Sequence, residues 1–340
     1  MTCPDDCHVH LRDGEALRHT VPETASCFAR ALVMPNLNPP VVTTEQALAY
    51  HQRVLSVIPP GVAFQPLMTL YLTEETTAQE VQKAKASGVI HGMKLYPAGV
   101  TTHSSAGVSN IERTYRVLEA LQDHDLPLLL HAEVADPQVD IFDREQLFIE
   151  RQLVPLVERF AGLRIVVEHI TTTEAVDFVR QASARIAATI TVHHLLMNRN
   201  ALFQGGFQPH HFCAPLLQRE RHRRALIKAA ISGSPKFFLG TDSAPHPKGA
   251  KECACAKPGI YTAPIALGLY AEVFEAAGAL HRLEAFSSHY GADFYGLPRN
   301  TGMLHLQRTP SAVPSELGLG DDVVVPLRAG GTVAWMLMER

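Results

Sequence analysis

Hydrophobic and polar positions follow two alternating patterns over most of this chain. Short runs of mainly apolar residues alternate with longer segments in which apolar residues recur every three or four positions. Short apolar runs are typical of strands buried on both faces of a parallel sheet, and the longer spacing is typical of helices with one buried face. Eight runs predict strands, at residues 7–11, 29–35, 63–71, 89–96, 126–131, 164–170, 186–193 and 236–241.

The segments between these runs predict helices that cover the strands. Several of them follow a Thr, Ser or Asp, the residue types that cap helix N-termini. Strand–helix units repeated eight times over about 250 residues are typical of an α/β fold, the parallel (β/α)8 barrel of the TIM type, so we expect that fold. The clearest helical segments are residues 43–58, 109–124, 143–160, 219–232 and 263–278, with a further one at 282–290.

The pattern of apolar and turn-forming residues changes near residue 299. From there to residue 340, short apolar stretches are separated by Pro and Gly, which indicates short strands and turns. We therefore expect two parts in the chain. The barrel spans residues 1–298, and a small C-terminal β segment, residues 299–340, packs on it.

Composition and charge indicate which kinds of molecule the protein binds. The net charge of −4 gives no basic surface for nucleic acid or for a membrane. No apolar stretch approaches the roughly 18 residues of a transmembrane helix, and the N-terminus lacks an apolar leader. We therefore expect a cytoplasmic protein with a small-molecule substrate. Six cysteines in 340 residues do not indicate a disulfide framework, so we expect reduced thiols.

Metal-binding residue types stand at the ends of the predicted strands. His8 and His10 are two apart, so an extended strand directs both side chains to one face, although such a pair is a weak signal among 18 histidines. The carboxyl ends of barrel strands converge on one mouth, where imidazoles and carboxylates can hold a hydrolytic metal ion. His193 and His194 are interpreted instead as ordinary core histidines. The predicted metal ligands are His8, His10, His131, His169 and Asp242.

Lys94 stands at the end of another predicted strand and is open to three interpretations. It is a lysine held in a salt bridge, a Schiff-base nucleophile, or an amine that has added carbon dioxide. The carbamate formed in the last case is a bidentate anion that can bridge two metal ions. The surrounding histidines favour the carbamate.

Eight short motifs carry a resemblance to a known family. In chain order they are HVHLRDG, VMPNLNPP, MKLYPAGVTT, HAE, FDRE, EHITT, LGTDSAPH and TAPIALG. By these motifs the chain resembles the amidohydrolase superfamily and, within it, the dihydroorotases of the short single-chain type. The resemblance implies two zinc ions bridged by carboxylated Lys94 and a hydroxide, with Asp242 as the catalytic general acid and base. The implied ligands are His8, His10 and Asp242 for the more buried ion, and His131 and His169 for the more exposed ion.

The resemblance also implies a substrate and its contacts. The reaction is then the reversible cyclisation of N-carbamoyl-L-aspartate to L-dihydroorotate and water in pyrimidine biosynthesis, carried out by a homodimer. A substrate carboxylate needs a guanidinium near the metals, and Arg12 lies two residues past His10. Ala214 stands where the family has leucine, but a main-chain contact survives that change. The implied contacts are Arg12, Asn36 and His246 at the carboxylate, Thr101 and Thr102 in a mobile loop, and backbone near Ala214 and Ala263.

Three other functions fit parts of the pattern. A hydantoinase or dihydropyrimidinase shares the metal ligands but handles rings without the carboxylate, so Arg12 and Asn36 argue against it. A metal-free lyase or aldolase would use Lys94 as a Schiff base. A non-catalytic barrel kept for protein interaction is disfavoured, because buried polar groups without a role are costly.

Overall fold

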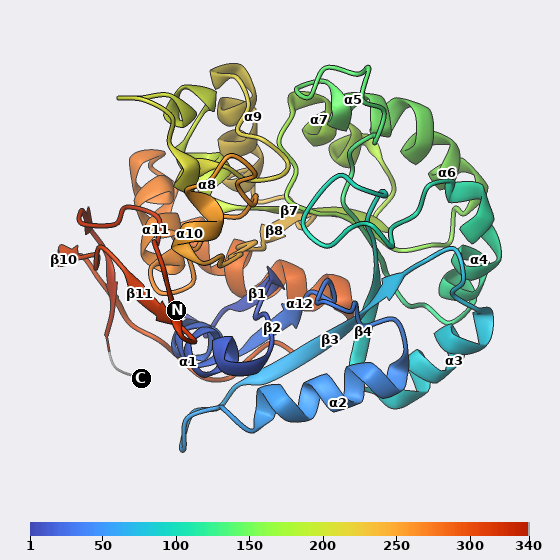
Figure 1. Cartoon of the computed structure of the whole chain (residues 1–340), viewed down its shortest axis with the longest axis horizontal. Coiled ribbons are helices and arrows are strands. Elements are labelled where there is room, and N and C mark those ends of the chain that lie inside the picture. Colours follow the sequence, from blue (N-terminus) through green and yellow to red (C-terminus); the bar gives the residue numbers. More distant parts are fainter. Residues whose placement is uncertain (339–340) are drawn as a thin grey trace.

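Eight parallel strands pair in chain order from β1 to β8 in the computed structural model, which describes residues 1–338 (Figure 1). This confirms the predicted (β/α)8 barrel. Each predicted strand is present, although most are shorter than their apolar runs. The strands are β1 (Asp5–Val9), β2 (Arg30–Val33), β3 (Gln65–Leu72), β4 (Ile90–Leu95), β5 (Leu128–Leu130), β6 (Ile165–Val167), β7 (Ile186–Ile190) and β8 (Phe237–Leu239).

The seam between β1 and β8 lies where the predicted metal ligands are. The backbone N–H of Asp242 donates to His8 O at 2.8 Å, and the N–H of His10 donates to Ser243 O at 3.1 Å. Closure of the barrel therefore brings residues more than 200 positions apart in the sequence together at its C-terminal mouth.

Helices surround the strands and form the outer layer of the barrel (Figure 1). Local signals fix where several of them begin; Thr43, for example, forms a capping box with Gln46. The helices are α1 (Leu17–Cys27), α2 (Thr44–Leu55), α3 (Ala78–Ser87), α4 (Tyr115–Asp123), α5 (Arg144–Phe148), α6 (Val154–Arg159), α7 (Thr173–Gln181), α8 (Val192–Leu196), α9 (Glu220–Ala230), α10 (Lys248–Lys251), α11 (Ala266–Ala276) and α12 (Tyr290–Tyr295).

Two predicted elements have different boundaries in the structure. The strand predicted at 186–193 ends at Ile190, because the Thr191 side chain accepts from the N–H of His194 and caps α8. His193 and His194 are therefore helical. The single helix predicted at 143–160 contains a π-helical turn, Ile149–Leu153, just before Pro155, whose missing N–H interrupts the regular hydrogen bonding.

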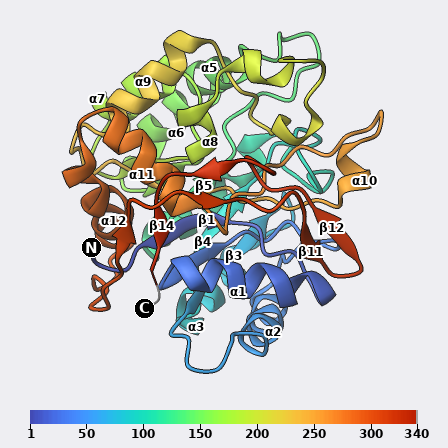
Figure 2. The same ribbon diagram turned by 90° about the vertical axis from the view of Figure 1, so that its left-hand side faces the viewer.

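The chain after residue 298 forms three two-stranded sheets, which confirms the short strands predicted there. Figure 2 shows these strands lying across α1 and α11. Val313, Leu327 and Val333 belong to the same hydrophobic core as barrel residues such as Tyr270. The division into two domains at residue 298 stays a prediction. The strands are β9 (Leu306–Gln307), β10 (Ser311–Ala312), β11 (Leu317–Leu319), β12 (Asp322–Val324), β13 (Thr332–Val333) and β14 (Met336–Leu337).

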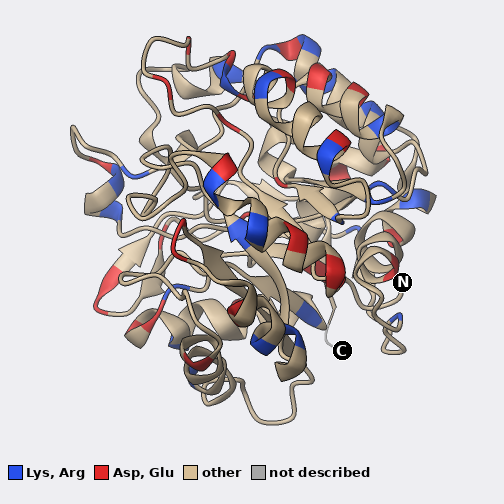
Figure 3. Ribbon diagram, turned by 90° about the vertical axis from the view of Figure 1, so that its right-hand side faces the viewer, with Lys and Arg blue, Asp and Glu red and all other residues tan. Residues whose placement is uncertain are grey.

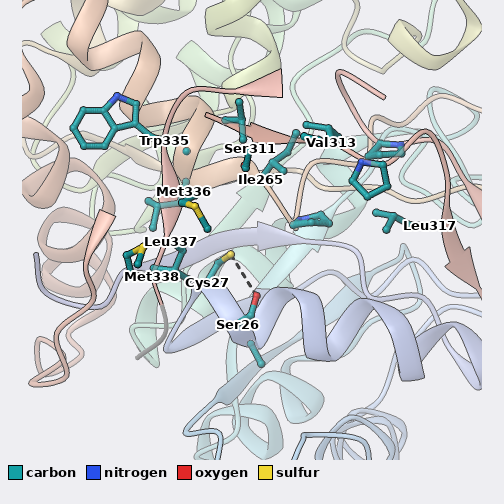
Figure 4. Close-up of a pocket in the computed structure, with 18 of the residues that line it drawn as sticks. Ser26, Cys27, Ile265, Ser311, Val313, Leu317, Trp335, Met336, Leu337 and Met338 are labelled. Carbon is teal, nitrogen blue, oxygen red and sulfur yellow. Dashed lines mark hydrogen bonds between the residues drawn. The ribbon is translucent and has the colours of Figure 1, made fainter. Parts of the chain in front are cut away.

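An outer surface of mixed charge and a mainly apolar cavity lie outside the barrel mouth. On the face shown in Figure 3, acidic and basic residues are interspersed over the outer helices. Among residues 1–338, no helix is long and apolar enough to cross a membrane. A cavity of about 910 Å³ lies between the end of α1 and the C-terminal strands, near Cys27 and Trp335 (Figure 4). It shares no residue with the cavity at the barrel mouth, and its lining is mainly apolar.

Candidate metal centre

Three predicted ligands converge at the seam of the barrel. The Nε2 atoms of His8 and His10 lie 3.3 Å apart. Asp242 Oδ1 lies 3.3 Å from His8 Nε2 and 3.0 Å from His10 Nε2. All three side chains are buried. Two imidazole nitrogens and a carboxylate oxygen that meet in this way are a set of donors that suits a divalent metal ion.

The other two predicted histidines lie beside this group. The His169 ring centroid is 5.1 Å from that of His8 and 4.8 Å from that of His131. Donor atoms of His8, His169 and Asp242 all lie within 4.8 Å of one another. Within residues 1–338, the buried Nδ1 of His169 has no hydrogen-bond partner. A buried nitrogen without a partner, beside other donors, fits a metal ligand.

The backbone is strained at this site. His169 has φ +42°, Asp242 has φ +46° and Arg12 has φ +63°. These values lie in the left-handed region, which residues other than glycine rarely adopt. Strain of this kind persists where the surrounding structure enforces it, and it is common at functional sites.

Lys94 is fully buried on β4, and its Nζ forms an ion pair with Glu168. Glu168 Oε1 also lies 3.0 Å from His8 Nδ1. Burial lowers the pKa of Lys94 despite this partner. The contact with Glu168 fits the salt-bridged interpretation of Lys94, and the carbamate stays a prediction.

Negative charge in the site favours a cation. Burial lowers the pKa of His8, but the carboxylates of Glu168 and Asp242 outweigh it and raise that pKa to about 9. The same field that stabilises a proton on His8 also stabilises a metal ion. The residues present thus fit a metal centre both in their donor atoms and in their charge.

Three acidic residues in this region were not predicted from the sequence. Glu168 directly precedes His169 at an apolar strand end, a signal that could have identified it. Glu133 Oε2 lies 2.7 Å from His131 Nε2. Asp6 accepts from His8 N and from Thr241, and burial raises its pKa to about 6. These acids orient the ligands, because each one bonds to a predicted ligand or to its neighbour.

The predicted substrate residues lie beside the metal ligands. Arg12 Nη2 is 3.1 Å from His246 Nε2, and Asn36 Oδ1 is 2.8 Å from His10 Nδ1. Burial lowers the pKa of Arg12 to about 10, so its guanidinium stays charged near neutral pH. The cavity at the mouth is lined by His8, His10, Arg12, Asn36, Tyr96, Thr101, Thr102, His131, His169, Ala214, Asp242, Ala244, Pro258 and Gly259.

The predicted mobile loop is closed over this cavity. Asn36 Nδ2 donates to Thr102 O at 3.2 Å, and Thr102 Oγ1 donates to Pro258 O at 3.4 Å. The free space beneath is about 20 Å³, which is room for about one water molecule. A substrate therefore cannot enter unless the loop moves.

Two of the predicted substrate contacts, His246 and Ala263, are not among the described residues that line the cavity. His246 contacts Arg12, which does line it, whereas the N–H of Ala263 donates to Ser243 Oγ at 2.9 Å. Pro258 and Gly259, which the sequence did not single out, line the cavity from the same connection. A substrate contact by Ala263 stays a prediction.

His193, His194 and Cys213 form a second buried group of possible metal ligands. His194 Nδ1 lies 2.6 Å from Thr191 Oγ1, and its Nε2 lies 3.1 Å from Pro215 O. Both nitrogens of His194 therefore already have partners. This agrees with the interpretation of His194 as an ordinary core histidine.

The fold and the site define a class of protein: a barrel hydrolase with a metal centre at its C-terminal mouth. The sequence model of the amidohydrolase family matches residues 6–317 of this chain. The chain is 59% identical over 339 residues to the dihydroorotase of Methylobacillus flagellatus, covering 100% of this chain and 98% of that protein. The chain belongs to the dihydroorotases of the amidohydrolase family.

Solved structures agree with this assignment. The dihydroorotase of Campylobacter jejuni has a TM-score of 0.91 at 36% identity, with 100% of this chain and 97% of that chain covered. The dihydroorotase of Saccharomyces cerevisiae in complex with 5-fluoroorotic acid has a TM-score of 0.92 at 31% identity, with 100% and 98% covered. The chain is thus a hydrolase that acts on cyclic amides.

Proposed function

We propose that this chain catalyses the reversible cyclisation of N-carbamoyl-L-aspartate to L-dihydroorotate and water, the ring-closing step of pyrimidine biosynthesis. One observation carries the proposal. A convergent group of candidate metal ligands and the half-buried guanidinium of Arg12 line the same small cavity. The ligands suit hydrolysis of an amide, and Arg12 suits a substrate that carries a carboxylate.

Residues are proposed for each of two zinc ions. His8, His10 and Asp242 would hold one ion, His131 and His169 would hold the other, and carboxylated Lys94 would be a further ligand. When bound, such ions supply polarisation of the amide carbonyl and an activated water. The lowered pKa of Lys94 supports the carbamate, because only a neutral amine adds carbon dioxide.

Asp242 is proposed to move the proton. In ring opening its carboxylate collects the proton of the attacking water and delivers it to the departing ring nitrogen. In ring closure it takes the proton from the ureido nitrogen that attacks. Its position supports this role, because Asp242 and Arg12 both line the cavity.

The remaining side chains bind the substrate and exclude water. Arg12, Asn36 and His246 orient the substrate carboxylate, and a paired guanidinium gives the strongest of these contacts. Thr101 and Thr102 close over the ring, so that the reaction proceeds away from bulk water. Backbone atoms near Ala214 position the ring.

The choice of substrate is the sharpest test of this proposal. Metal-loaded protein is assayed with L-dihydroorotate and with dihydrouracil, which is the same ring without the carboxylate. Ultraviolet absorbance measures ring opening. We expect the protein to open the ring of dihydroorotate and not that of dihydrouracil. Efficient opening of dihydrouracil would indicate the hydantoinase activity instead, and failure to open either ring would contradict the proposed reaction.

We also propose a homodimer in the cytoplasm. The family resemblance supports both the dimer and the location. For the location there is also the finding that no helix among residues 1–338 could span a membrane. Light scattering should give a mass near twice 37.2 kDa. A mass near that of a single chain would contradict the dimer.

A further inference from the structure

Lys251, the last residue of α10, is a buried cation without an acidic partner. Its side chain is 3% exposed. Nζ donates to Phe212 O at 2.8 Å and to Gly259 O at 2.6 Å. No carboxylate of residues 1–338 forms an ion pair with it. An unpaired buried charge is costly, so this arrangement needs a compensating gain.

The two carbonyls belong to two segments that line the cavity at the mouth. Phe212 lies two residues before Ala214, and Gly259 follows Pro258. Ala214, Pro258 and Gly259 all line the cavity. The segments also bond to each other directly, because Gly259 N donates to Phe212 O at 2.9 Å. Lys251 therefore holds together two pieces of backbone that line the cavity.

The charge of the Arg12 guanidinium also acts on Lys251. Arg12 contacts His246, whose Nε2 lies 3.0 Å from Pro258 O. Burial and the charge of Arg12 together lower the pKa of Lys251 to about 8, although the nearby Cys213 opposes this shift. Two cations beside one cavity create a positive potential, which an anionic substrate would relieve.

We propose that Lys251 is a positioning residue for the substrate: it holds the backbone at Phe212 and Gly259, and its charge strengthens binding of the substrate carboxylate. This inference rests on the proposed function. It does not require Lys251 to touch the substrate. The gain from anion binding is what balances the burial of its charge.

Lys236 offers a matched control in the same chain. Its Nζ also donates only to carbonyls, those of Val179, Arg180 and Ala182. Lys236 directly precedes β8, so it lies at the opposite end of the barrel from the mouth. Its substitution therefore tests the loss of a lysine–carbonyl contact without a change near the substrate.

The experiment measures the Kd of 5-fluoroorotate by calorimetry with metal-loaded protein. Lys251→Gln keeps a hydrogen-bond donor but removes the charge, and we expect its Kd to rise on the order of tenfold. Lys251→Arg keeps the charge and should stay within about threefold of wild type. Lys236→Gln should bind as wild type does. In turnover, Lys251→Gln should raise KM more than it lowers kcat.

Several outcomes would overturn the inference. A natively folded Lys251→Gln protein with an unchanged Kd would show that the charge has no effect on the substrate. Lys251→Met serves as a second uncharged variant, and if neither folds while Lys251→Arg does, the role is structural only. Failure of the wild type to bind 5-fluoroorotate would instead contradict the proposed function itself.

Discussion

At the scale of single residues, the site depends on carboxylates that hold the basic ligands in place. Glu168 contacts both Lys94 and His8, and Glu133 contacts His131. Acids that orient metal ligands in this way fix the direction of each ring and each amine. The convergence of the predicted ligands could be expected, because strand ends in a barrel converge. Glu168 has a signal in the sequence, its place directly before His169, but Glu133 has none, because a single carboxylate in a sequence does not reveal its partner.

Glu168→Gln tests this orientation. It leaves Lys94 buried without a countercharge, so the free energy of unfolding of metal-free protein should fall by about 3 kcal/mol or more. Urea unfolding after chelation measures it. Glu158→Gln, at an exposed position, is the control and should change little. A loss below about 1 kcal/mol for Glu168→Gln would show that the pair does not stabilise the fold.

At the scale of elements, apolar runs predicted all eight strands, because strands buried on both faces need little polar surface. Their ends were less predictable, since local caps such as Thr191 decide where the chain leaves the sheet. Lys251 was missed for a related reason. A lysine among polar loop residues looks exposed in the sequence, and only the packing of α10 against Phe212 and Gly259 buries it.

Glu145 links α5 to the start of α7. Its buried carboxyl group should make the stability of the fold depend on pH. It accepts from the N–H and hydroxyl of Thr171, and burial raises its pKa to about 7. The folded state therefore binds this proton more tightly than the unfolded state does. Stability from Glu145 is fully present below its unfolded pKa, near 4.5, and is lost as pH rises through about 7.

Glu145→Gln should therefore weaken the pH dependence of the free energy of unfolding. Between pH 5 and pH 8, we expect the wild type to lose on the order of 1–3 kcal/mol more unfolding free energy than the variant does. Urea unfolding at both pH values gives this difference. Parallel profiles for the two proteins would contradict the assignment to Glu145.

The loop that carries Thr102 should control access to the site. Thr102→Ala removes the hydroxyl that holds the loop to Pro258, a bond of about 1–1.5 kcal/mol, so kcat/KM should fall about tenfold. Steady-state kinetics with dihydroorotate measure it. Ser105→Ala, in an exposed part of the same loop, should behave as wild type. Equal kinetics for both variants would argue against closure through Thr102.

At the scale of the whole molecule, the C-terminal segment shares a hydrophobic core with the barrel. Val313 and Val333 belong to the barrel's own hydrophobic core, and the Gly268 position on α11 has no room for a side chain against Trp335 O. The sequence indicated the change at residue 299, because turn residues become frequent there. It could not indicate how much core the two parts share.

A chain that ends at residue 298 should therefore not fold as an independent barrel. It would expose the core that Val313 and Val333 cover, so we expect aggregation or loss of a cooperative thermal transition. Calorimetry of the truncated and full chains compares them. A cooperative transition in the truncated chain would support two independent domains.

The central claim is that one mouth of this barrel combines a two-metal centre with a site for a carboxylate-bearing ring. Elemental analysis of the purified protein, together with dihydroorotate ring opening in the same sample, tests it most directly. The account predicts near two zinc per chain and turnover that a chelator abolishes. Turnover that persists in metal-free protein, or two bound metals without any turnover of dihydroorotate, would contradict it.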